Sequence, residues 1–116
     1  MLKKHLISYT YAIRGISNAF RSEPNMIIHS VAALAVLIVN YVLRISRTDW
    51  VITLILIGVV LMSEVFNTAV ERLANRITTE RDPLIGQAKD LAAGAVLIMA
   101  IFAVICAGII YWPYVF

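Results

Sequence analysis

Hydrophobic residues dominate three long stretches of the chain, and charged residues lie between them. Residues 26–43, 51–63 and 91–111 contain no charged side chain. An α-helix rises about 1.5 Å per residue and a bilayer's hydrocarbon core is about 30 Å thick, so about 20 mostly apolar residues cross it. The pattern therefore predicts an all-α membrane protein with transmembrane helices at about 24–43, 50–75 and 87–112.

The first part of the chain has a more broken pattern. Apolar side chains recur there every three or four residues, at Leu6, Tyr9, Ile13, Ile16 and Phe20. Basic residues occupy other positions of the same stretch, which is typical of an amphipathic helix lying on a membrane surface. We expect such a helix at about 2–22, ended by Glu23-Pro24, where proline begins the next helix.

Composition indicates a membrane environment, and the distribution of basic residues indicates the orientation of the chain in the membrane. Apolar residues make up 61% of the 116 residues, well above the share in soluble domains. Four basic residues precede the first span, two follow it, and four lie between the second and third spans. Because basic residues gather in cytoplasmic segments, we expect the N-terminus in the cytoplasm. The one cysteine, Cys106, excludes an internal disulfide, and no nucleic-acid partner is expected.

A polar stripe interrupts the end of the second apolar stretch. Its members share one helix face at offsets of three, four, seven and eleven residues: Glu64, Asn67, Thr68, Glu71 and Asn75. Glu64 would lie about 21 Å into the bilayer and about 10 Å short of the opposite boundary. Glu71 would lie at or beyond that boundary. An ionisable group at such a depth is costly, so the stripe predicts a functional site.

Carboxylates and cations gather on the same predicted side of the membrane. Magnesium is bound by one or two carboxylates together with substrate phosphates, which makes Glu23 and Glu71 candidate ligands. The five glycines form no Walker A loop. Phosphate would then be bound by Lys89, nearby arginines and helix termini.

Two runs of sequence resemble a known family. Residues 64–71 read Glu-Val-Phe-Asn-Thr-Ala-Val-Glu, and residues 88–97 read Ala-Lys-Asp-Leu-Ala-Ala-Gly-Ala-Val-Leu. Together with Arg14-Gly15 and Glu23 ahead of the first span, they are similar to the signature of the small bacterial integral-membrane diacylglycerol kinase and undecaprenol kinase family. The resemblance covers nearly the whole chain. It implies a homotrimer in the bacterial inner membrane, with active sites shared between neighbours at the cytoplasmic boundary.

The same resemblance implies an activity and a role for each site residue. ATP would be the phosphoryl donor and a membrane lipid alcohol the acceptor. Glu64 would be the general base, Asn67 would orient the site, and Mg²⁺ would bind Glu23 and Glu71. Contacts to the nucleotide and its metal would come from a wider set: Tyr11, Glu23, Glu71, Glu80, Lys89 and Asp90. His29, six residues after Glu23, resembles the undecaprenol branch, with diacylglycerol as the alternative acceptor.

Two positions depart from the family's pattern. Asn75 stands where the family usually has aspartate, and Asp82 where it usually has histidine. We expect the change Asn75→Asp to lower the magnesium requirement with little effect on the saturated rate. Asp82 is a weak candidate for contact with nucleotide.

Other interpretations of these residues stay open at this point. Glu64 would also suit an interhelical hydrogen bond, or the proton site of a small proton-coupled carrier or rotor-ring subunit. His29 is expected to contact packing partners or headgroups, and Asn40 and Tyr41 to lie at the membrane interface. The arginines at 72, 76 and 81 suit orientation signals better than phosphate ligands. The second carboxylate, Glu71, and the Lys89-Asp90 pair favour a kinase over a carrier.

Overall fold

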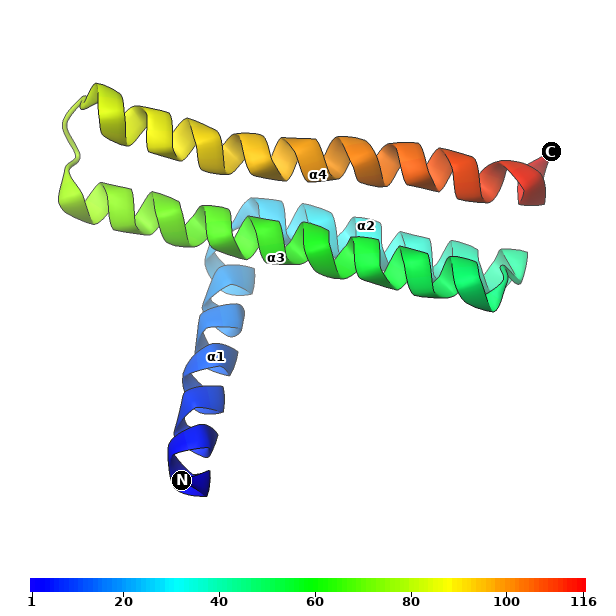
Figure 1. Ribbon diagram of the computed structural model, residues 1–116, viewed down its shortest axis with the longest axis horizontal. Helices are drawn as coiled ribbons and strands as arrows, with labels where there is room; N and C mark the ends of the chain where they lie inside the picture. Colours follow the sequence, from blue (N-terminus) through cyan, green and yellow to red (C-terminus); the bar gives the residue numbers. More distant parts are fainter.

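The computed structural model describes residues 1–116 as four α-helices (Figure 1). They are α1 (Leu2–Ser22), α2 (Pro24–Leu43), α3 (Arg47–Ile77) and α4 (Pro83–Val115). Helices α2, α3 and α4 run alongside one another, whereas α1 runs across them and leads away from the bundle. The last three helices are each long and apolar enough to cross a membrane.

Two prolines determine where helices begin. Pro24 and Pro83 lie in the first turns of α2 and α4, where the missing N–H of proline costs nothing. A proline restricts the preceding residue to extended backbone, and Glu23 (φ −112°, ψ 112°) and Asp82 (φ −107°, ψ 120°) adopt it. Both acidic residues therefore lie at a helix N-terminus, the positive end of its dipole.

The bounds of α2 coincide with the first predicted span, but α3 and α4 extend beyond the other two. Helix α3 begins at Arg47 because Ser46 caps it, accepting a hydrogen bond from the Asp49 N–H at 3.1 Å. Helix α4 begins at Pro83 because the Asp82 carboxylate caps it. The predicted start of the third span, at about residue 87, was therefore too late, and residues 78–82 alone join α3 to α4.

The link between α2 and α3 is a tight turn. Arg44 adopts left-handed backbone (φ 51°, ψ 51°), and the Ile45 N–H donates to the Asn40 carbonyl at 3.3 Å. This six-residue closure is a Schellman motif, which satisfies carbonyls at the end of a helix. Ile45 is buried under the turn. The two helices are thus held antiparallel by residues 44–46.

The interior of a single chain is small and half polar. The buried residues are Ala19, Met26, Ile45, Ala74 and Ile110 among the apolar ones, and Asn40, Thr53, Glu64, Asn67 and Thr68 among the polar ones. Most large apolar side chains face outward. Lipid tails are as apolar as leucine, so association of membrane helices depends on close packing and polar contacts. The buried polar residues therefore decide how α2, α3 and α4 fit together.

Two polar contacts fix the register of α2 against α3. His29 Nε2 lies 3.6 Å from Glu64 Oε2, and eleven residues along both helices Asn40 Nδ2 donates to Thr53 Oγ1 at 2.8 Å. Eleven residues are about three helical turns, so the same two faces meet at both levels. Asn40 is 0% exposed and also accepts from the Tyr111 hydroxyl at 2.5 Å. The sequence alone did not indicate that the Asn40 amide joins all three long helices.

Candidate active site

Glu64 lies inside the bundle, with 2% of its surface exposed. Helix α3 directs it towards α2, where His29 Nε2 is 3.6 Å from its carboxylate. The part of α4 that crosses the bundle, residues 91–111, has no charged side chain. A carboxylate removed from water and paired with an imidazole is suited to proton transfer.

Two further polar groups lie one turn along α3 from Glu64. Asn67 is 7% exposed and Thr68 is 4% exposed, and neither the Asn67 Oδ1 nor the Thr68 Oγ1 has a hydrogen-bond partner. Leaving a buried polar atom unpaired costs about 1–3 kcal/mol, so such atoms in a folded protein call for an explanation. They are suited to contact a ligand that carries its own polar groups.

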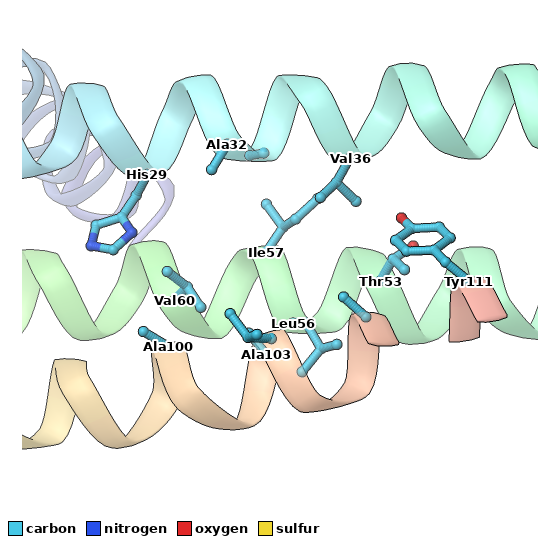
Figure 2. A pocket seen from close by; sticks show the side chains of 13 residues that line it. His29, Ala32, Val36, Thr53, Leu56, Ile57, Val60, Ala100, Ala103 and Tyr111 are labelled. Carbon is cyan, nitrogen blue, oxygen red and sulfur yellow. The ribbon is translucent and has the colours of Figure 1, made fainter. Parts of the chain in front are cut away.

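An apolar cavity of about 230 Å³ lies between α2, α3 and α4. It exists because α4 presents the small side chains of Ala100, Ala103 and Ala107 to its neighbours. His29 lies at one end, while Thr53 and Tyr111 lie at the other (Figure 2). Eleven of its thirteen lining residues are hydrophobic, so it suits a hydrocarbon chain whose polar end lies near His29.

Glu23 contacts the residue that follows Glu71 on α3. The residue after Glu71, Arg72, has its guanidinium 3.7 Å from Glu23 Oε1. Arg72 also donates to Asn18 Oδ1 at 2.6 Å and to the Ser22 hydroxyl, which ties α3 to the end of α1. The arginine predicted as an orientation signal thus also positions one of the candidate metal ligands.

The two carboxylates fit the needs of magnesium. No group of three or more His, Cys, Asp or Glu side chains comes together in the chain. Magnesium does not need one, because it binds one or two carboxylates and completes its shell with phosphate and water. Glu23 and Glu71 are both half-buried and offer hard oxygen donors next to the buried polar stripe.

The proposed nucleotide contacts are not gathered around Glu64 within one chain. Lys89 Nζ donates to Asn75 Oδ1 at 2.9 Å, across α3 and α4. Tyr11, Glu80 and Asp90 are exposed. The guanidinium carbon of Arg14 lies 5.6 Å from the centre of the Tyr11 ring. Both residues belong to α1, the helix that leads away from the bundle (Figure 1).

Sequence reasoning missed two residues of this site. His29 was expected to contact packing partners or headgroups, but it contacts Glu64 and lines the cavity. Thr68 was recognised in the polar stripe without a role, and its hydroxyl is buried and unpaired. A signal for Thr68 was present in the stripe, whereas none marked His29 as the partner of Glu64.

Known proteins similar to this chain share nearly its whole length. It is 38% identical to the undecaprenol kinase of Bacillus subtilis (strain 168) over 112 residues. These residues cover 97% of this chain and 91% of that protein. It is 31% identical over 104 residues to the diacylglycerol kinase of Escherichia coli (strain K12), covering 90% and 85% of the two chains. The diacylglycerol kinase of Haemophilus influenzae is 29% identical over 110 residues, 93% of either chain.

The match to the family as a whole has the same extent. Residues 10–111 match the model of the family described as prokaryotic diacylglycerol kinase. The matched range begins in α1 and ends in α4. It includes Glu64, its partner His29, both candidate metal ligands and the lining of the cavity. The chain therefore belongs to the prokaryotic diacylglycerol kinase family.

Proposed function

We propose that this protein transfers the γ-phosphoryl group of ATP to the hydroxyl of a membrane lipid alcohol, and that this alcohol is undecaprenol. One observation carries the proposal: a buried carboxylate, Glu64, lies beside His29, and His29 lines one end of an apolar cavity. A lipid lying in the cavity would present its hydroxyl to that carboxylate. Family membership favours this activity over a proton-coupled carrier or a rotor-ring subunit.

Proton abstraction is the part of the reaction that this geometry supports best. Glu64 accepts the hydroxyl proton as the lipid oxygen bonds to the γ-phosphorus, and the bond to ADP breaks on the opposite side. Phosphoryl transfer requires mainly positioning and charge neutralisation. The unpaired Asn67 Oδ1 and Thr68 Oγ1 are near enough in sequence to orient the acceptor beside Glu64. Burial keeps out water, the competing acceptor.

The donor side of the reaction is assigned to the cytoplasmic boundary. Glu23 and Glu71 would hold Mg²⁺, which neutralises phosphate charge when bound with ATP. Lys89, Asp90, Glu80 and Tyr11 would contact the nucleotide. The basic residues before the first span and between α3 and α4 favour a cytoplasmic location of these groups, where ATP is present.

The choice of acceptor is supported by two observations. The Bacillus subtilis relative named undecaprenol kinase is 38% identical to this chain, against 31% for the Escherichia coli diacylglycerol kinase. His29, at the position that suggested the undecaprenol branch, lies where the acceptor's polar end would be. Diacylglycerol is the alternative acceptor within the same family.

The test is a transfer assay on purified protein reconstituted in lipid vesicles. Labelled ATP and Mg²⁺ are supplied with undecaprenol or with diacylglycerol in parallel, and we expect labelled undecaprenyl phosphate to form faster. Glu64→Gln should lose at least ~10²–10⁴-fold in kcat, as is typical when a general base is removed. Asp49→Asn, at the opposite end of α3, is the control and should keep wild-type activity. Wild-type-like turnover by Glu64→Gln would exclude Glu64 as the base.

A further inference from the structure

The buried position of Glu64 raises a question about the end of each catalytic cycle. A general base that has taken a proton must release it before it can act again. Glu64 is 2% exposed, so it has almost no direct contact with water. Its contact on α2 is His29, whose side chain is 21% exposed and whose Nε2 lies 3.6 Å from Glu64 Oε2.

We propose that His29 is the proton relay of Glu64, a role that rests on the proposed kinase function. In each turnover the hydroxyl proton passes to Glu64 as the new oxygen–phosphorus bond forms. The proton then leaves Glu64 for Nε2 of neutral His29, and the imidazolium releases a proton from Nδ1 to water. Glu64 is restored as a carboxylate, and His29 is left neutral with its proton on Nε2. Proton exchange with water then returns the proton from Nε2 to Nδ1, which frees Nε2 for the next cycle.

The surroundings of the pair leave His29 without a competitor for this role. Helix α2 has no Asp, Glu, Lys or Arg, and the charged residue nearest to His29 in sequence is Glu23, which precedes α2. Within α3 the charged residue nearest to Glu64 is Glu71, two turns away. The facing part of α4 presents alanines, and α1 contacts the bundle near Glu23 through Arg72. Tyr111, the other titratable residue of the cavity, lies at its opposite end (Figure 2).

The relay also explains why a histidine suits this position. A lone carboxylate is costly to ionise in an apolar environment, and a group that exchanges a proton with it lowers that cost. Glutamine has nearly the same length and polarity, but its amide cannot take up and release a proton. His29 therefore acts through Glu64 and not on the acceptor itself, so its loss should lower kcat more than it raises the acceptor's KM.

The experiment compares His29→Ala and His29→Gln with wild type in the vesicle assay, at saturating Mg-ATP and varied undecaprenol. We expect kcat to fall by about 10–100-fold, less than for loss of the base itself, with the acceptor's KM within about twofold. The matched control is His5→Gln, because His5 is the chain's other histidine and is exposed on α1. It should behave like wild type.

Chemical rescue separates proton transfer from packing. Imidazole added to His29→Ala should restore part of kcat, because it fits the enlarged cavity and accepts a proton. Pyrazole has the same ring shape but is a far weaker base, so it should not. Wild-type kcat in His29→Gln, or the same response of His29→Ala to both azoles, would overturn the relay while wild-type transfer continued. Absence of lipid phosphorylation by the wild-type protein would instead overturn the proposed function.

Discussion

Glu23 is the residue on which two interactions converge. Its carboxylate lies 3.7 Å from Arg72, and it is also a proposed ligand of Mg²⁺. Arg72 in turn contacts Asn18 and the Ser22 hydroxyl, so the carboxylate is held at the junction of α1, α2 and α3. This fixed position offsets part of the entropy cost of ordering a ligand, and it distinguishes Glu23 from Glu71, for which no side-chain partner is found.

Replacing either carboxylate by an amide should weaken magnesium binding. Each change removes one charged oxygen from a site with few protein ligands. We expect Glu23→Gln and Glu71→Gln to raise the magnesium concentration for half-maximal rate by about tenfold or more, and excess magnesium to restore part of the rate. The measurement is initial rate against magnesium at fixed ATP, with Asp49→Asn as the control. An unchanged magnesium dependence would remove that residue from the ligand set.

Asn75 has a contact that its sequence position alone did not indicate. Lys89 Nζ donates to Asn75 Oδ1 at 2.9 Å, whereas the family usually has an aspartate here. Asparagine holds the ammonium group without neutralising its charge. Lys89 therefore keeps its full attraction for phosphate while its position is fixed.

Asn75→Asp should consequently weaken ATP binding. The new carboxylate would form an exposed ion pair with Lys89, worth about 0.2–1 kcal/mol, so we expect the KM for ATP to rise by up to about fivefold. This replaces the expectation of an effect on magnesium alone. The control is Asn75→Ala, which removes the contact to Lys89 without adding a negative charge. We expect it to leave the charge of Lys89 unpaired, so that the KM for ATP does not show the rise caused by the carboxylate. A lower magnesium requirement with unchanged KM for ATP would show that the carboxylate acts on the metal.

Among the helices, α4 shows most clearly how one residue places others. The Asp82 carboxylate accepts hydrogen bonds from the Leu84 N–H at 2.9 Å and the Ile85 N–H at 3.2 Å. It thereby starts α4 about two turns before Lys89 and Asp90. The residue considered as a weak nucleotide contact has a structural role that accounts for its presence.

Asp82→Ala should destabilise the start of α4, and Asp82→Asn should not. Loss of an N-cap costs about 1 kcal/mol, and asparagine caps as well as aspartate. Thermal unfolding in detergent measures the difference, and the KM for ATP of Asp82→Asn tests for a nucleotide contact through the charge. Equal stability of the two variants would contradict the capping role of Asp82. A raised KM for ATP in Asp82→Asn, with stability unchanged, would support a contact between Asp82 and the nucleotide.

The helices were predictable from sequence where the signal is local. The uncharged run and Pro24 fixed both the existence and the start of α2. The predicted start of α4, at about residue 87, was too late, because proline is favourable in a first helical turn and the acidic residue before Pro83 supplies a cap. The same Glu-Pro and Asp-Pro pairs, considered together, would have indicated both starts.

For the whole molecule, sequence predicted the helices but not how they meet. The polar stripe identified Glu64, Asn67 and Thr68 as one face, and these are buried. The partners of that face come from elsewhere: His29 is distant in sequence from Glu64, and Tyr111 is still further from Asn40. No local pattern encodes such pairs, because they depend on the register between helices. The burial of Asn40 between three helices was missed for this reason.

Part of the proposed site is exposed on the outside of a single chain. Lys89 is directed at Asn75 on α3 of its own chain, and the next residue, Asp90, is exposed on another face of α4. Asp90 lies beside Gly94 and Ala95 in a shallow surface groove, where small residues allow a second helix to approach closely. In the homotrimer that the family resemblance implies, we therefore propose that Asp90 serves the Glu64 of an adjacent chain.

Mixing two inactive variants tests whether the site is shared. If Glu64 and Asp90 of one site come from different chains, co-reconstituted Glu64→Gln and Asp90→Asn subunits should regain roughly a quarter of wild-type activity, because random assembly in a ring pairs two intact groups at that frequency. Glu64→Gln mixed with Glu71→Gln is the matched control, since both residues lie on α3 of one chain and should yield no gain. Recovery is measured as undecaprenol phosphorylation after joint unfolding and refolding. No recovery in the first mixture would place Glu64 and Asp90 in the same chain's site.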